Sequence, residues 1–93
     1  MYNRKDILDF LQHLIDEIQK QINGEVWYEE DYIGQSYIIR IKDSDVKCSF
    51  NVTKQLYKIE TQRDGEKLLF EIIQKYKEYI LEKYFVPVEK REL

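Results

Sequence analysis

The chain has 93 residues and a formal net charge of −3, with 43% hydrophobic and 35% charged residues. This length supports one hydrophobic core, so we expect a single domain over residues 1–86 and a flexible tail over residues 87–93. The sequence has no apolar run long enough to cross a bilayer, no signal-peptide segment and only one cysteine, which favours a cytoplasmic protein. The acidic balance argues against a general nucleic-acid binder, because non-specific binding depends on many cationic contacts to phosphates.

Residues 4–23 carry apolar side chains at helical spacing, which predicts an amphipathic helix. Asn3 is its predicted N-cap, and Gly24 is the residue expected to stop it. From residue 25 the apolar period changes to two, which predicts four antiparallel strands over 25–32, 36–42, 46–53 and 56–62. A second helix is expected from Asp64, its predicted N-cap, until shortly before Pro87.

The element order α-β-β-β-β-α with short connections predicts an α+β fold. We expect an antiparallel meander sheet with both helices packed on one face. The opposite face of the sheet would then be open to water or to a partner.

The register of the sheet follows from requiring apolar side chains of neighbouring strands to meet. This rule sets Ile41 opposite Cys48 and Ile39 opposite Phe50, and it sets Phe50 opposite Ile59 of the fourth strand.

In the first hairpin, a two-residue turn at positions 34–35 would set Tyr32 opposite Tyr37 and point Trp27 outward. We prefer this register because it buries one carboxylate where the alternative buries two, and an unpaired buried carboxylate is costly. It also predicts an ion pair between Glu29 and Arg40, and a cation–π contact between Trp27 and Lys42.

The outward-facing residues of the first three strands form the candidate partner-binding surface. They are Trp27, Glu29, Asp31, Ile38, Arg40, Lys42 and Lys47. A large exposed aromatic residue ringed by charges is typical of an interface hot spot. The alternative interpretation is an ordinary solvated sheet face.

The acidic run at residues 29–31, with Asp43 and Asp45, would allow the first hairpin to imitate the phosphates of a nucleic acid. The alternative is that these charges protect an edge strand from aggregation.

Asp45 and Lys47 match the acid-x-Lys half of a metal-dependent nuclease motif, with Asp31 or Glu30 as the upstream acid. About three such acid-x-basic matches are expected by chance in this composition. His13 and Cys48 have no partner residue that predicts chemistry. We therefore expect no catalytic residue, metal ligand or cofactor.

The coarse order of helix, sheet meander and helix is similar to that of the double-stranded-RNA-binding domain. That family starts its second helix with lysines, whereas residues 64–67 here read Asp-Gly-Glu-Lys, so its RNA contacts are not carried over. The size, the acidity and the bias toward Lys, Ile, Tyr and Glu without any Ala also resemble small phage-encoded inhibitors such as anti-CRISPR proteins, and point to a phage or a low-GC bacterium.

The sequence favours a small non-enzymatic protein-binding module, of the kind with which phages or mobile elements inhibit a nucleic-acid-handling protein. One alternative is a nucleic-acid-binding domain that uses Arg40, Lys42, Lys47 and Lys58 on the open sheet face. The other is a small metal-dependent nuclease. A homodimer is left open, and no membrane partner is expected.

Overall fold

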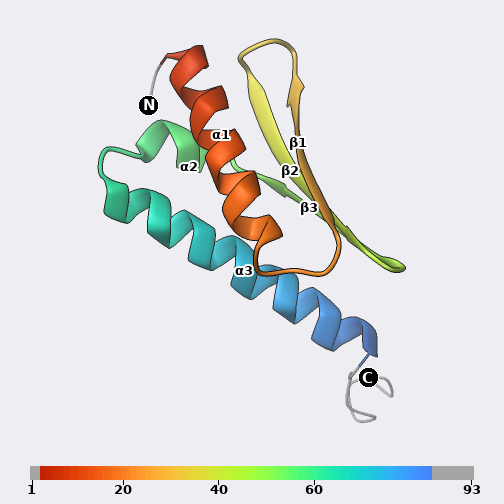
Figure 1. Ribbon diagram of the computed structural model, residues 1–93. Coiled ribbons are helices and arrows are strands. Elements are labelled where there is room, and N and C mark those ends of the chain that lie inside the picture. Colours follow the sequence, from red (N-terminus) through yellow and green to blue (C-terminus); the bar gives the residue numbers. More distant parts are fainter. Residues whose placement is uncertain (1–2, 85–93) are drawn as a thin grey trace, which may run out of the picture.

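The computed structural model describes residues 3–84, which fold into three helices and one three-stranded sheet (Figure 1). In chain order the elements are α1 (Arg4–Gln19), β1 (Glu25–Asp31), β2 (Ser36–Asp43), β3 (Val46–Asn51), α2 (Thr53–Lys58) and α3 (Gln62–Tyr84). The strands form an antiparallel meander in the order β1-β2-β3. Helix α1 packs against β1 and α3 packs against β3, both on the same face of the sheet. The predicted α+β class and its meander sheet are confirmed, and the predicted tail over residues 87–93 lies outside the described residues.

Helix α1 begins as the sequence predicts and ends earlier. The side chain of Asn3 accepts a hydrogen bond from the backbone N–H of Lys5 at 2.8 Å, which confirms it as the N-cap. The helix ends at Gln19, so Gly24 is not its stop signal. Gly24 is instead required by packing, because a Cβ atom there would lie 2.3 Å from the backbone oxygen of Lys42.

The hairpin between β2 and β3 has the predicted register, with Ile39 opposite Phe50 and Ile41 opposite Cys48. In the β1–β2 hairpin the prediction is wrong by two residues. Residues 32–35 form a four-residue connection in place of the two-residue turn, and Trp27 lies opposite Arg40. A shift of two residues keeps every side chain on its predicted face, because side chains alternate with a period of two.

The predicted fourth strand over 56–62 is wrong, because helix α2 extends to Lys58 and the next residues connect it to α3, which starts at Gln62. The cause lies at the end of β3. The side chain of Asn51 accepts hydrogen bonds from the backbone N–H and the hydroxyl of Thr53, whose oxygen accepts the backbone N–H of Tyr37. These bonds turn the chain out of the sheet, and the buried residues that follow, Val52, Leu56 and Ile59, have helical spacing. The predicted pairing of Phe50 with Ile59 therefore does not exist.

Helix α3 starts two residues before the predicted N-cap. Asp64 accepts hydrogen bonds from the backbone N–H groups of Glu60 and Thr61, while the Thr61 hydroxyl accepts the backbone N–H of Asp64 at 3.2 Å. This reciprocal arrangement is a capping box with Thr61 as the N-cap and Asp64 three residues later. The backbone hydrogen bonds from Glu60 and Thr61 stabilise the ionised carboxylate and so lower the pKa of Asp64.

The core lies between the inner face of the sheet and the three helices. Tyr37, Ile39 and Ile41 of the central strand are at most 1% exposed, and α1 covers them with Ile7, Leu11 and Ile18. Within residues 3–84 no helix combines the length and the apolar character that crossing a membrane requires.

Candidate functional site

The outer face of the sheet is the side opposite the helices, and the seven predicted partner-binding residues all lie on it. Strand alternation places them there, since their neighbours at odd spacing enter the core. Trp27 is 37% exposed, whereas Ile39 on the opposite face is fully buried. The sequence-based assignment of the faces is therefore correct.

Arg40 lies at the centre of this outer face and is held by two neighbouring strands. Its Nε lies 2.8 Å from a carboxylate oxygen of Glu29, and its Nη1 donates to the hydroxyl of Ser49 at 2.8 Å. The other oxygen of Glu29 accepts the indole N–H of Trp27 at 3.3 Å. Arg40, and to a smaller extent Trp27, lower the pKa of Glu29. The predicted Glu29–Arg40 ion pair thus exists as a diagonal contact, and it orders this part of the face.

The remaining cations of the outer face lie near the turn between β2 and β3. Lys42 and Lys47 are directly opposite each other on β2 and β3. Two like charges in this position destabilise a sheet. On β1 the residue opposite Lys42 is Glu25, and Trp27 lies opposite Arg40, so the predicted cross-strand pairing of Trp27 with Lys42 is wrong.

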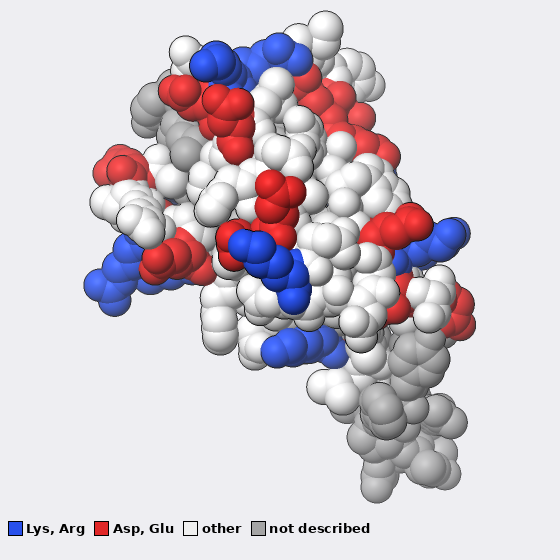
Figure 2. Space-filling model, viewed as in Figure 1, with Lys and Arg blue, Asp and Glu red and all other residues white. Residues whose placement is uncertain are grey.

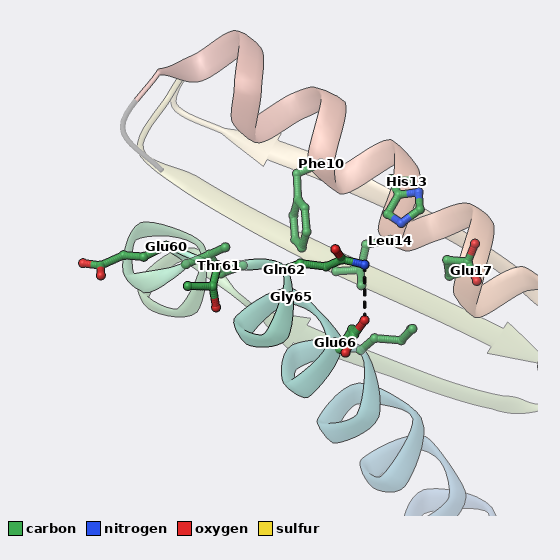
Figure 3. A pocket seen from close by; sticks show the side chains of 11 residues that line it. Phe10, His13, Leu14, Glu17, Glu60, Thr61, Gln62, Gly65 and Glu66 are labelled. Carbon is green, nitrogen blue, oxygen red and sulfur yellow. Dashed lines mark hydrogen bonds between the residues drawn. The ribbon is translucent and has the colours of Figure 1, made fainter.

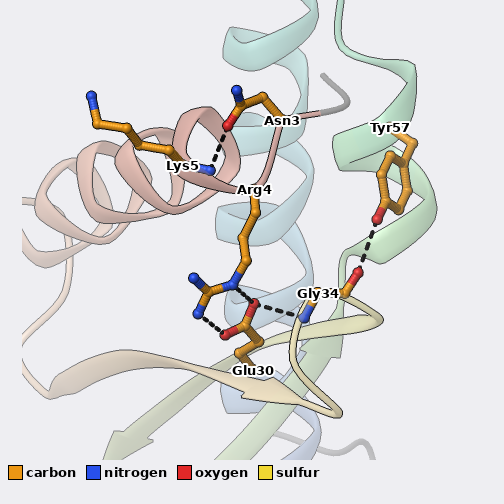
Figure 4. Close-up of polar contacts among 6 residues, drawn as sticks. All are labelled: Asn3, Arg4, Lys5, Glu30, Gly34 and Tyr57. Atoms are coloured by element: carbon orange, nitrogen blue, oxygen red, sulfur yellow. Dashed lines mark hydrogen bonds and ion pairs between the residues drawn. The ribbon is translucent and has the colours of Figure 1, made fainter.

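The acidic run of the first hairpin is largely neutralised within the molecule. Glu30 points to the inner face, where both of its oxygens receive hydrogen bonds from Arg4, at 2.6 and 2.8 Å (Figure 4). The hydrogen bonds from Arg4 lower the pKa of Glu30, whereas its burial acts in the opposite direction. Of the three acids at 29–31, Asp31 is the one without an ion pair within residues 3–84.

The tip of the same hairpin exposes two large side chains that the sequence analysis did not select. Tyr32 is 82% exposed and Ile33 is 80% exposed. The tip is fixed from both sides, because the Gly34 N–H donates to Glu30 at 2.9 Å and the Tyr57 hydroxyl donates to the Gly34 oxygen at 3.1 Å (Figure 4). Gly34 has a φ of +80°, a conformation that glycine adopts without strain. The loop therefore connects α1 and α2 to an ordered, exposed apolar tip.

The residues of the hypothetical nuclease site do not come together. Asp31 pairs with Ser36 at one end of β2, whereas Asp45 follows Asp43 at the other end. The two ends of β2, Ser36 and Asp43, are seven residue steps apart, which corresponds to about 23 Å along the strand. Among residues 3–84 no three histidine, cysteine or acidic side chains are grouped so as to hold a metal ion.

Two further residues that the sequence singled out also stand apart from any cluster. Cys48 is buried in the core, and burial raises the pKa of its thiol. Lys58 ends α2 and is not on the sheet, so it cannot join Lys42 and Lys47 in a common basic surface.

A groove on the helical side was also missed by the sequence analysis. It lies between α1 and the first turns of α3 and has a volume of about 680 Å³ (Figure 3). Phe10, Leu14 and Leu69 form its apolar floor. No local sequence signal marks this groove, because its two sides are about 50 residues apart in the chain.

Comparison of the chain with protein-family models, with curated proteins and with solved structures gave no match.

Proposed function

We propose that this chain is a protein-binding module that contacts its partner through the outer face of the sheet. The observation that carries the proposal is the half-exposed Trp27 beside an Arg40 that is already held in place by Glu29 and Ser49. Tryptophan and arginine are the residue types most enriched at interface hot spots. Because these side chains are ordered before binding, less conformational entropy is lost when a partner covers them.

The charge distribution favours a protein over a nucleic acid as that partner. The outward acids Glu25, Glu29 and Asp31 line β1, and the cations lie on β2 and β3, so the outer face has no net excess of either sign. On the helical side, the charged side chains of residues 3–84 form small groups separated by uncharged surface, with no broad basic area among them (Figure 2). Nucleic-acid binding depends on a concentrated positive patch.

A narrower form of the proposal is an inhibitor of a nucleic-acid-handling protein. Its support is the acidic edge of the outer face, where Asp31 has no ion pair within residues 3–84 and Glu25 stands at the opposite end of β1. Neutralisation of Glu29 and Glu30 by arginines leaves this edge weaker as a phosphate mimic than the sequence suggests.

The test compares the capture of partners by the wild type, by Trp27→Ala and by a matched control, Phe70→Ala. Phe70 is 66% exposed on α3, away from the sheet face, so the control removes an exposed aromatic side chain from another surface. We expect one protein from host lysate to be retained by the wild type and by Phe70→Ala, and to be lost with Trp27→Ala. Equal retention by all three would contradict the proposal.

Two accompanying measurements make the result specific. Trp27→Ala should lower the free energy of unfolding by only about 1 kcal/mol, because its side chain is partly exposed. A gel shift with single- and double-stranded DNA and RNA at two salt concentrations identifies the alternative partner. Salt-sensitive binding lost in Lys42→Ala would replace the protein partner by a nucleic acid.

A further inference from the structure

The shape of the groove between α1 and α3 follows from the close approach of the two helices. At Gly65 a Cβ atom would lie 3.0 and 3.1 Å from two ring carbons of Phe10, so the glycine lets the aromatic ring rest against the α3 backbone. In Figure 3 the Phe10 ring points from α1 toward α3 beside Gly65. The crossing is therefore close at this point, and the rest of the space between the helices stays open.

The rim of the groove is acidic. Its eleven lining residues include Glu17, Glu60 and Glu66, and none of the eleven is a lysine or an arginine. Glu17 is paired with Lys20, but Glu60 and Glu66 have no ion pair within residues 3–84. The side chain of Glu66 accepts only a long hydrogen bond from Gln62, at 3.4 Å. Two carboxylates without an ion pair within residues 3–84 thus flank the apolar floor, that of Glu66 beside the helices and that of Glu60 extending outward at the α2 end of the groove (Figure 3).

The start of α3 is capped beside the groove, because the backbone N–H groups of Glu60, Thr61 and Asp64 are bonded to the side chains of Asp64 and Thr61. The groove accordingly combines an apolar floor with a negative rim.

We propose that this groove binds an amphipathic helix of a partner protein, with an apolar anchor residue flanked by lysine or arginine. An apolar groove between two neighbouring helices can accept a third helix, whose side chains interdigitate with those of the groove. The basic flanks of such a helix complement Glu60 and Glu66, while its anchor covers Phe10, Leu14 and Leu69. This site is separate from the outer face of the sheet and does not depend on it.

The first hairpin of a second copy of this chain fits the groove poorly. The exposed apolar tip of the first hairpin, Tyr32 and Ile33, is preceded by Asp31, which has no ion pair within residues 3–84. Docking of this tip in the groove would bring the Asp31 carboxylate toward the carboxylates of Glu60 and Glu66. Charge therefore disfavours this hairpin tip as the occupant and favours a basic partner segment.

The test uses two designed helical peptides that share one leucine-rich face and differ in carrying lysine or glutamate on the other. They are titrated into the full chain, and backbone amide shifts are followed by NMR. We expect the lysine peptide to shift the resonances of His13, Gly65 and Glu66, and the glutamate peptide to leave them unchanged. Equal binding of both peptides, or shifts confined to the Trp27 face, would overturn the proposal.

Charge-reversal variants separate groove binding from general attraction to an acidic protein. Glu60→Lys with Glu66→Lys should weaken the lysine peptide at least about tenfold. The control reverses Glu71 and Glu78, which are exposed on α3 outside the groove, and so has the same net charge. The control should bind like the wild type, and equal weakening in both double variants would contradict a specific site. Trp27→Ala should leave this binding unchanged, so failure here is distinguishable from failure of the outer-face proposal.

Discussion

Single side chains explain how this small chain tolerates a carboxylate on the inner side of its sheet. Glu30 faces the helices, with its side chain only 14% exposed, and it receives two hydrogen bonds from Arg4 and one from the N–H of Gly34. An inward carboxylate is costly unless it is paired. Here the pair also connects the first turn of α1 to the tip of the first hairpin.

The pH dependence of stability should reveal this pair. Because Arg4 lowers the pKa of Glu30 below its usual 4.5, the folded state binds a proton there less readily than the unfolded chain. The stabilisation is therefore complete above pH 4.5 and is lost as the pH falls through the lowered pKa. Urea unfolding from pH 7 to pH 2 should show Glu30→Gln as less stable than the wild type at pH 7, and the difference should shrink below pH 4.5.

A matched variant gives the baseline for this measurement. Glu71 is exposed on α3 and has no ion pair within residues 3–84, so Glu71→Gln should follow the wild-type curve over the same range. A gap between Glu30→Gln and the wild type that persists at pH 2 would mean that packing, and not the charge, makes Glu30 important.

At the level of elements, a polar contact attaches α3 to the sheet in addition to its apolar face. The hydroxyl of Tyr76 donates a hydrogen bond to the carboxylate of Asp43 at the end of β2. Burial, followed by the Asp43 carboxylate, raises the pKa of Tyr76. This contact fixes the position of a 23-residue helix along the strands.

Removing that hydroxyl should weaken the attachment of the helix. Tyr76→Phe keeps the ring and leaves Asp43 without its donor, so we expect a loss of about 1–2 kcal/mol in the free energy of unfolding. Tyr79→Phe is the control, because Tyr79 is 45% exposed on the same helix. Denaturant unfolding of both variants at pH 7 measures the difference, and equal stabilities would show that the bond contributes little in solution.

At the scale of the whole molecule, the two faces of the sheet have different surroundings. The inner face and the helices form the core, whereas the outer face remains uncovered within residues 3–84. A domain of this size has few core residues to lose.

Truncation of one central core residue should therefore be far more damaging than truncation on the outer face. Ile39→Ala, at a fully buried position, should cost about 2–5 kcal/mol, several times the cost expected for Trp27→Ala. Thermal and denaturant unfolding of the two variants tests this ratio. Comparable losses would show that Trp27 is a structural residue, which would remove the main support for the outer-face proposal.

The sequence by itself determined the features that depend on local periodicity. It defined α1, β2 and β3, the Asn3 cap and the outward orientation of the seven predicted partner-binding residues, because strand alternation and helical spacing depend on neighbouring positions in the chain. The outward placement of Lys58 was wrong, because it depended on the fourth strand. The face assignment survived the error in the first hairpin because the register shifted by an even number of residues.

Tertiary structure decided the rest. Residues 52–59 have an apolar spacing that suits a strand or a helix, and the hydrogen bonds among Asn51, Thr53 and Tyr37 favour helix α2 over a fourth strand. The pairing of Arg4 with Glu30 joins residues 26 positions apart, and the groove joins helices still further apart. Such contacts depend on how elements pack in space, and no local pattern encodes which distant side chains will meet.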